Sequence, residues 1–367
     1  MIRLSKSCLS HLEKSAVMKV LDKEFLGMGE EVREFEKLLT SFFGRPAVCV
    51  SSGTAALHLA LQAAGINNGD EVLVQSLTYV ASFQAISATG ATPIACDVDS
   101  DTLCIDLKDA ESKLTQNTKA IMPVHYSGGV GNLEQVYAFA DRHDLRVIED
   151  AAHALGTSYM GKRVGGFGDI ACFSFDGIKN ITSGEGGCIV TNDNNILQAV
   201  RDTRLLGVKK DTEKRYSGER SWKFDVSEQG WRYHMSNIMA AIGIVQLGKL
   251  EGFSRKRREL AIRYDELLTD SNINPIQHNY NEVVPHIYVV RLPGGVDRSN
   301  VEKQLLRKGI QSGIHYHPNH WLTKYKTNDK LKVTDDQYLN LLTLPLHSDI
   351  EINDVEYICE NLLRACQ

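Results

Sequence analysis

Short β-rich runs alternate with helical segments through the first half of the chain, and this alternation constrains the fold more than any other sequence feature. The run PAVCV is followed by GTAALHLALQAA, EVLVQ by YVASFQAISATG, and KAIMPVHY by LEQVYAFADRHD. Strands followed by helices at this spacing predict a parallel or mixed sheet with helices on both faces. Runs such as VCV, VLV and IMPV are apolar at every position, which is typical of central strands buried on both sides. We therefore predict an α/β domain.

A second, smaller domain is predicted at the C-terminal end. A long helical pattern covers residues 235–268, apolar in its first part and charged in its second, and it would lead out of the large domain. After it come strand-like HIYVVRL, a helix NVEKQLLRKG, the segment IHYHPNHW and a closing helix INDVEYICENLL. With 367 residues, the chain is long enough for one large core and one smaller core. We place the large domain at 1–248 and a small α+β domain at 249–367.

The composition argues against several classes of partner. The net charge is -5, and acids and bases are mixed along the chain without a basic tract that would follow a nucleic-acid backbone. No run of about 18 apolar residues occurs, as a membrane span would need, and the start MIRLSKSCLSHLEKS has no apolar core of signal-peptide length. The 8 cysteines include no CxxC pair, so no metal site is predicted. We expect a cytoplasmic protein that binds neither nucleic acid nor membrane.

A possible phosphate site follows the first strand. In VCVSSGTAALHLAL, a β-run meets Ser51, Ser52, Gly53 and Thr54, and a helix then opens. The free N–H groups and the positive end of such a helix would suit a phosphate. Ser52 or Thr54 could equally be an ordinary helix cap. Taken alone, the motif is not specific for a phosphate.

Two further strand ends carry residues that could contact a ligand. LRVIEDAAHALG places Asp150 at the carboxyl end of a strand, where ligands bind in open α/β sheets, and His153 follows one turn later. Asp150 could pair with a protonated ring nitrogen, or it could be a solvated acid or a helix cap. His153 could reach the same ligand or simply pack in the fold. Tyr79, after another strand, could stack on a flat ring, although core packing would also explain it.

Lys179 stands between an apolar run and a glycine-rich turn in FSFDGIKNITSGEGG. Among Phe173, Phe175, Ile178 and Ile181 its amine would lose solvation, and its pKa would fall below the reference value of about 10.4. Such an amine can form a Schiff base. Ser174, five residues earlier, could offer a hydroxyl to a phosphate. The alternative is a lysine that extends from a loop into solvent.

The order of these features along the chain narrows the choice of ligand. A phosphate cradle, an aromatic ring, a strand-end acid and then a lysine match the needs of pyridoxal phosphate: a phosphate anchor, a ring stacker, a partner for the ring nitrogen, and a lysine for the aldehyde. Each feature has a simpler explanation, but all four together favour this cofactor.

The chain resembles the DegT/DnrJ/EryC1/StrS family of sugar aminotransferases, which are pyridoxal phosphate enzymes of fold type I, the aspartate aminotransferase fold. The resemblance covers nearly the full length and rests on segments that occur in the family's order: FLGMGEEVREFE, SSGTAALHLAL, PVHYSGGVGNL, VIEDAAHALG, FSFDGIKNITSGEGG, GWRYHMSNIMAAIGIVQL and GIHYHPNH. It implies a large domain with a mixed, mostly parallel sheet and a smaller C-terminal α+β domain.

The resemblance also implies roles for individual residues. Lys179 matches the catalytic lysine that forms the Schiff base and moves protons, and Asp150 the partner of the pyridine nitrogen. The other matched residues hold the cofactor or border the sugar pocket: Gly53, Thr54 and Ser174 at the phosphate, Tyr79 on the ring, His153 beside the ring oxygen, and His315 and Tyr316 at the sugar. In the family, the segment matched by GWRYHMSN reaches the active site of the second subunit of a homodimer. Many members read GxNYRM there, whereas this chain has Arg232 and His234 at the asparagine and arginine positions.

The activity implied is transfer of an amino group from L-glutamate to C4 of a nucleotide-linked 4-keto-6-deoxy sugar, with dTDP or UDP as the nucleotide. The sequence IKNITSGEGG is more similar to the C4 group than the GKNLGAxGDxG of members that act at C3. Related 3-dehydratases have histidine in place of Lys179. The products would be amino sugars for surface glycans such as lipopolysaccharide O-antigen. Two alternatives stay open: a 3-aminotransferase on a 3-keto sugar, and a regulator that binds pyridoxal phosphate without turnover.

Overall fold

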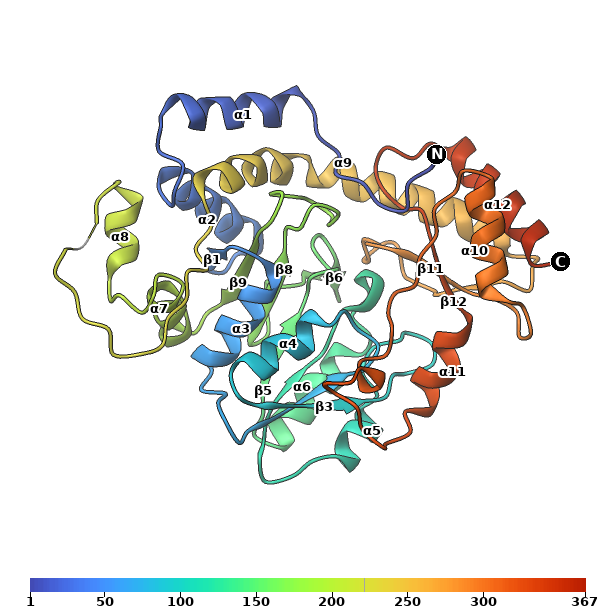
Figure 1. The fold of residues 1–367 in the computed structure, drawn as a ribbon, viewed down its shortest axis with the longest axis horizontal. Helices are drawn as coiled ribbons and strands as arrows, with labels where there is room; N and C mark the ends of the chain where they lie inside the picture. The colour runs from blue at the N-terminus through green and yellow to red at the C-terminus, as the bar shows by residue number, and fades with distance from the viewer. Residues whose placement is uncertain (221) are drawn as a thin grey trace.

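A seven-stranded sheet forms the centre of the large domain in the computed structural model, which describes residues 1–220 and 222–367 (Figure 1). The strand order is β1-β9-β8-β5-β4-β2-β3. Strand β9 runs antiparallel to both β1 and β8, whereas the other neighbours are parallel. The strands are β1 Ala47–Val50, β2 Glu71–Gln75, β3 Thr92–Cys96, β4 Thr118–Met122, β5 Arg146–Asp150, β8 Ile170–Ser174 and β9 Gly187–Thr191. The prediction of a mixed, mostly parallel sheet is confirmed.

Helices cover both faces of this sheet. They are α2 Glu30–Phe43, α3 Gly53–Ala63, α4 Ala81–Ala88, α5 Leu107–Ser112, α6 Leu133–Arg142 and α7 Asn194–Thr203, whereas α8 Asp211–Tyr216 lies beside α2 and α7 at the edge of the molecule (Figure 1). Successive residues of a strand point to opposite faces, so a strand covered on both sides must be apolar at every position. Thus Leu73 packs in the core that includes α2 and α6, whereas Val72 and Val74 pack in the core that includes α3 and α4.

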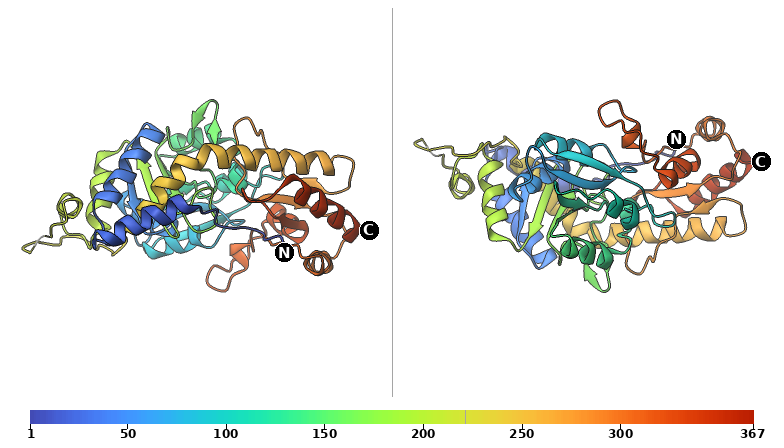
Figure 2. Two further views of the ribbon diagram at one scale, coloured as in Figure 1. Left: turned by 90° about the horizontal axis from the view of Figure 1, so that it is seen from above. Right: turned by 90° about the horizontal axis from the view of Figure 1, so that it is seen from below.

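Helix α9, Asn237–Leu268, leads from the large domain to the smaller C-terminal part of the chain (Figures 1 and 2). Ser236 caps its start, because the Ser236 side chain accepts a hydrogen bond from the Met239 N–H at 3.3 Å. The smaller part contains a three-stranded sheet, β10-β11-β12, which shares a separate apolar core with the end of α9 and with α10 and α12. Its elements are β10 Asn274–Pro275, β11 Tyr288–Arg291, α10 Arg298–Arg307, α11 Lys332–Asn340, β12 Leu341–Leu344 and α12 Ile352–Ala365.

The proposed boundary between residues 248 and 249 falls inside α9, which is continuous there. The first residues of the chain also lie beside the smaller part: the Ile2 N–H donates to the Gly309 carbonyl oxygen at 2.7 Å, and Lys6 pairs with Asp349 at 2.5 Å. We keep the two-domain division as a proposal in which α9 belongs to both domains. The remaining elements are α1 His11–Asp22, β6 Ser158–Tyr159, β7 Lys162–Arg163 and the 3₁₀ turns η1 Tyr126–Gly128 and η2 Asn319–Trp321. Within the described residues, no helix has the length and apolar character needed to cross a membrane.

Glu13 attaches α1 to α9. Its carboxylate is 2% exposed and accepts hydrogen bonds from Lys249 at 2.5 Å, Gln246 at 2.7 Å and Ser10 at 2.8 Å. Burial alone would raise the pKa of Glu13, but these donors outweigh it and lower the pKa to about 2. A depressed pKa contributes stability above the unfolded-state value, near 4.5, and that stability is lost as the pH falls toward 2.

We expect Glu13→Gln to lower the free energy of unfolding at pH 7 by up to about 3 kcal/mol, because about 1.4 kcal/mol corresponds to each pKa unit. The difference from the wild type should shrink as the pH falls from 4.5 to 2. Urea unfolding at several pH values measures both quantities. The exposed Glu24 is the matched control, since Glu24→Gln should leave both unchanged. A difference that stays constant across this pH range would contradict the prediction.

Candidate active site

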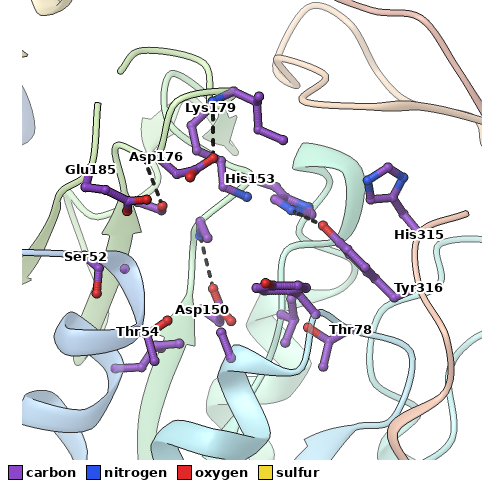
Figure 3. Close-up of a pocket in the computed structure, with 18 residues that line it drawn as sticks. Ser52, Thr54, Thr78, Asp150, His153, Asp176, Lys179, Glu185, His315 and Tyr316 are labelled. Atoms are coloured by element: carbon purple, nitrogen blue, oxygen red, sulfur yellow. Dashed lines mark hydrogen bonds between the residues drawn. The ribbon is translucent and has the colours of Figure 1, made fainter. Parts of the chain in front are cut away.

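A cavity of about 490 Å³ lies where the carboxyl ends of β1, β2, β5 and β8 meet a segment of the C-terminal part (Figure 3). The sheet topology explains the convergence, because these parallel strands end at the same edge. The predicted site residues that line the cavity are Gly53, Thr54, Tyr79, Asp150, His153, Ser174, Lys179, His315 and Tyr316. The structure therefore brings together all the predicted site residues except Arg232 and His234.

The start of α3 forms an anion cradle. Ser52 is the helix cap, because its Oγ accepts a hydrogen bond from the Ala55 N–H at 3.1 Å. This leaves the exposed Thr54 hydroxyl and the first N–H groups of the helix free to bind a ligand in the cavity. A Cβ on Gly53 would come within 2.8 Å of the Ser174 Cβ, so only glycine allows this close approach. Ser174 Oγ accepts from the Asp176 N–H at 3.3 Å, which leaves its own proton available for a phosphate oxygen.

Asp150 is held in one orientation at the end of β5. Its side chain is buried: Oδ2 accepts a hydrogen bond from Ser82 Oγ at 2.7 Å, and Oδ1 accepts one from the Ala152 N–H at 3.2 Å. Thr78 Oγ1 lies 3.1 Å from Ser82 Oγ and so fixes that hydroxyl in turn. A buried carboxylate with fixed geometry suits a protonated ring nitrogen better than a solvated acid would.

Ser82 was not among the residues predicted from the sequence. The available signal was its position three residues after Tyr79, one helical turn further along the start of α4. That signal is weak, because serine is common near the start of a helix for reasons unrelated to a ligand.

Three rings form one wall of the cavity. Tyr316 OH lies 2.9 Å from His153 Nε2 (Figure 3). The centroids of the Tyr79 and Tyr316 rings are 5.7 Å apart. Burial, with smaller contributions from Lys179 and other histidines, lowers the pKa of His153 well below 6.5, so the ring is neutral and can accept the Tyr316 proton. Tyr79 is 59% exposed, which rules out core packing as the reason for its position. Its face is available for a flat ring.

Lys179 follows β8 in a loop held by its own hydrogen bonds. The Lys179 N–H donates to the Asp176 carbonyl oxygen at 3.1 Å, and Asn180 Nδ2 donates to the Leu155 carbonyl oxygen at 2.9 Å. Burial lowers the pKa of the Lys179 amine to about 8, although Asp150 and Asp176 oppose the shift. Because this pKa is about 8, a substantial fraction of the amine is neutral and nucleophilic near pH 8. Ile178, which was expected to help bury this lysine, is 37% exposed.

The cavity also contains two acids that were not predicted as site residues, Asp176 and Glu185. Burial, and then Asp176, raises the pKa of Glu185. Among the described residues that line the cavity, Lys179 is the sole lysine or arginine. The cradle therefore offers hydroxyl and N–H donors to a phosphate, but this chain places no arginine beside it.

Arg232 and His234 lie outside the cavity. Their segment runs beside the end of β1: His234 forms an antiparallel bridge with Val50, and the Ser51 N–H donates to the Tyr233 carbonyl oxygen at 2.6 Å. Arg232 is exposed. Burial and then the charge of Arg232 lower the pKa of His234 to about 4, so His234 is neutral at pH 7. Arg232 is thus the cation of this pair at neutral pH.

The residues of the cavity fit pyridoxal phosphate. The close approach of Gly53 to Ser174 and the free start of α3 form a phosphate cradle, and the exposed face of Tyr79 can take the ring. Asp150 provides a fixed carboxylate, and Lys179 an amine with a lowered pKa. These are the groups that the cofactor requires.

Comparisons with known proteins agree with this geometry. Residues 7–363 match the model of the DegT/DnrJ/EryC1/StrS aminotransferase family. MJ1066 of Methanocaldococcus jannaschii, an uncharacterized protein, is 34% identical over 363 residues, which are 95% of this chain and 94% of that protein.

Two solved structures are similar over nearly the whole fold. The putative sugar aminotransferase Spr1654 of Streptococcus pneumoniae, solved in PMP and PLP forms, has a TM-score of 0.92 and 29% identity, covering 100% of this chain and, in the PMP form, 97% of its own. PseC of Helicobacter pylori, an aminotransferase involved in the biosynthesis of pseudoaminic acid, has a TM-score of 0.91 and 28% identity, covering 99% of this chain and 98% of its own.

Proposed function

Because the chain belongs to the DegT/DnrJ/EryC1/StrS aminotransferase family, we propose that it transfers an amino group from L-glutamate to C4 of a nucleotide-linked 4-keto-6-deoxy sugar. The chain is a sugar aminotransferase of a family that depends on pyridoxal phosphate. The convergence of Lys179, Asp150 and the anion cradle on one cavity supports the aminotransferase chemistry, and the sequence IKNITSGEGG supports the C4 position. The nucleotide is dTDP or UDP in this proposal.

We assign the cofactor contacts as follows. The start of α3 at Gly53 and Thr54, with Ser174, binds the phosphate; Tyr79 stacks on the ring; Asp150 holds the proton of the ring nitrogen; and His153 lies beside the ring oxygen. The bound cofactor supplies an aldehyde that carries the amino group and a protonated ring that withdraws electrons. The tyrosines and His153 reduce the access of water to this side of the cavity.

Lys179 moves the proton in both half-reactions. Its Nζ takes the proton from Cα of glutamate in the first half-reaction and delivers a proton to C4 of the sugar in the second. A pKa of about 8 suits an amine that must both accept and release a proton near neutral pH. Glutamate and the keto sugar become 2-oxoglutarate and the amino sugar, so no net oxidant or reductant is consumed. Asp150 stabilises the electron-poor state of the ring through its charge.

The homodimer is part of this proposal. A phosphate in the cradle would meet Asp176 and Glu185 without an arginine from the same chain, whereas Arg232 is exposed outside the cavity. Large apolar side chains are also exposed on and beside α1, including Leu12, Met18 and Leu21, and such patches are typical of protein interfaces. We propose that a second copy contributes Arg232 to the phosphate, and that His315 and Tyr316 border the sugar. The cytoplasmic location and the use of the product in a surface glycan stay predictions.

The C4 assignment is tested by product identification. Purified protein, pyridoxal phosphate and L-glutamate are incubated with nucleotide-linked 4-keto and 3-keto 6-deoxy sugars, each as dTDP and UDP forms. We expect formation of 2-oxoglutarate and an amino sugar with the 4-keto substrates, with the new amine located at C4 by NMR. An amine at C3 would favour the 3-aminotransferase instead. A protein that binds the cofactor but shows no half-reaction with glutamate or any other amino donor would favour the non-catalytic alternative.

A further inference from the structure

Ser76, His320 and Asp335 form a hydrogen-bonded chain beside the cavity but outside it. Ser76 Oγ lies 2.7 Å from His320 Nδ1, and His320 Nε2 lies 3.0 Å from Asp335 Oδ1. Ser76 is 0% exposed and His320 is 2% exposed. Burial lowers the pKa of His320 while Asp335 opposes the shift, so the neutral ring accepts the Ser76 proton at Nδ1 and donates Nε2–H to Asp335.

These residue types are those of a serine hydrolase triad, but the geometry excludes that chemistry. A nucleophilic serine must reach a substrate, whereas Ser76 is completely buried. Its Oγ also accepts a hydrogen bond from the His320 N–H at 3.1 Å. Ser76 is therefore bonded to the side chain and the backbone of the same histidine, which indicates a structural connection between two segments.

One end of this connection is the loop that carries Tyr79. Asn319 donates from its backbone N–H to the Ser76 carbonyl oxygen at 3.0 Å, and from Nδ2 to the Ser76 and Thr78 carbonyl oxygens at 2.9 and 2.7 Å. Asn319 and His320 thus bind each end of the loop 76–78, directly before Tyr79. Thr78 extends this series of hydrogen bonds toward the cavity. Its Oγ1 is hydrogen-bonded to Ser82 Oγ, and Ser82 Oγ donates to Asp150.

The other end of the connection, at Asp335, is also held by hydrogen bonds. Asp335 lies in the first turn of α11, and Asp97 caps that turn by accepting hydrogen bonds from the Thr334 N–H at 2.7 Å and the Val333 N–H at 2.9 Å. Asp97 follows β3 directly, so both ends of the connection are anchored to the central sheet. The segment that carries Asn319 and His320 also carries Tyr316, three residues before Asn319, and the Tyr316 ring faces Tyr79 in the cavity.

We propose that His320 is a positioning residue. Through its hydrogen bond to Ser76, it holds the loop 76–78 before Tyr79 against the segment that carries Tyr316. The same contact thereby helps to fix Ser82 and Asp150. The inference rests on the proposed function, in which Tyr79 and Asp150 contact the cofactor. A histidine suits the position because its two nitrogens bind Ser76 and Asp335 at the same time. The relative placement of the ring stacker and the ring-nitrogen partner then depends on a residue that touches neither the cofactor nor the substrate.

The test compares His320→Ala, His320→Asn and His320→Gln. The asparagine Oδ1 can replace Nδ1 as acceptor for Ser76, whereas glutamine reaches toward Asp335 and loses the Ser76 bond. For His320→Ala and His320→Gln we expect pyridoxal phosphate affinity to fall on the order of tenfold, as for one lost buried hydrogen bond, and the visible circular dichroism of the bound cofactor to weaken. His320→Asn should recover most of both. Lys332→Ala, on the exposed start of α11, the helix that carries Asp335, is the control and should change neither.

Ser76→Ala provides a second test if the histidine variants do not fold, because it removes one buried hydroxyl with little change in volume. It should weaken the same circular dichroism signal while the thermal transition shows a single folded species. Unchanged affinity and circular dichroism in His320→Ala, or equal effects of the asparagine and glutamine variants, would overturn the inference. Wild-type protein that binds no pyridoxal phosphate would instead refute the proposed function.

Discussion

Lys179→Ala is expected to lower the turnover of amino sugar by more than about 10³-fold, because it removes the group that we propose moves the proton in both half-reactions. The loop should keep its shape, since it is held by the Lys179 backbone N–H and by the Asn180 side chain, which the substitution leaves in place. Removing an amine whose pKa is lowered by burial also removes an unfavourable buried charge. Folding should therefore be retained.

Steady-state formation of 2-oxoglutarate measures the loss. Borohydride treatment followed by peptide mass spectrometry gives an independent readout, since it should fix the cofactor on Lys179 in the wild type and on no residue in the variant. Lys209→Ala is the matched control, because Lys209 is an exposed lysine of the same chain. Near-normal turnover of Lys179→Ala, or a cofactor fixed on another lysine, would remove Lys179 from the mechanism.

Asp150→Asn should lower turnover by about 10²- to 10³-fold, the typical loss when one electrostatic contact to a charge-bearing centre is removed. Asparagine has nearly the same shape, and its Oδ1 can still accept a hydrogen bond from Ser82 or Ala152. What is lost is the negative charge that keeps the ring nitrogen protonated. The effect should therefore be on the chemical step more than on the fold.

Single-turnover kinetics with glutamate measures that step directly, because the visible absorbance of the cofactor changes as the amino group is transferred. We expect a lower rate with little change in the thermal transition. Asp144→Asn is the matched control. Asp144 is exposed and lies just before β5, the strand that ends with Asp150. Its φ of 55° is one that asparagine tolerates. An equally fast half-reaction in Asp150→Asn would show that the ring nitrogen does not depend on this carboxylate.

Much of the fold followed from local patterns. Residues that are apolar at every position of VCV and VLV are the ones that the two faces of a helix-covered sheet require, and the structure places them in the two cores. The order of Thr54, Tyr79, Asp150 and Lys179, each at or after the end of a strand, also indicated the position of the cavity, because parallel strands end at one edge. The long helix begins at Asn237, two residues after the predicted start, since Ser236 is its cap.

The detailed roles of several site residues depended on distances between residues far apart in the sequence. Only the structure shows that Ser52 is the helix cap and Thr54 is free, and that Tyr79 is exposed in the cavity. The contact of Ser82 with Asp150 has only a weak local signal and that of His320 with Ser76 has none, because each pair is joined by a hydrogen bond across many residues of sequence, 68 in one case and 244 in the other. The motif likewise did not show which of Arg232 and His234 is the exposed cation, which the structure shows to be Arg232.

The amino-acid sequence by itself determined the α/β class and the order of the elements, and it identified the lysine and the carboxylate that we propose for the chemistry, since hydrophobic periodicity and strand-end positions are local properties. The tertiary structure decided which hydroxyls cap and which are free, what orients Asp150, and how the C-terminal segment holds the Tyr79 loop. Those outcomes depend on which distant groups meet at hydrogen-bonding distance, and packing determines this only once the chain has folded.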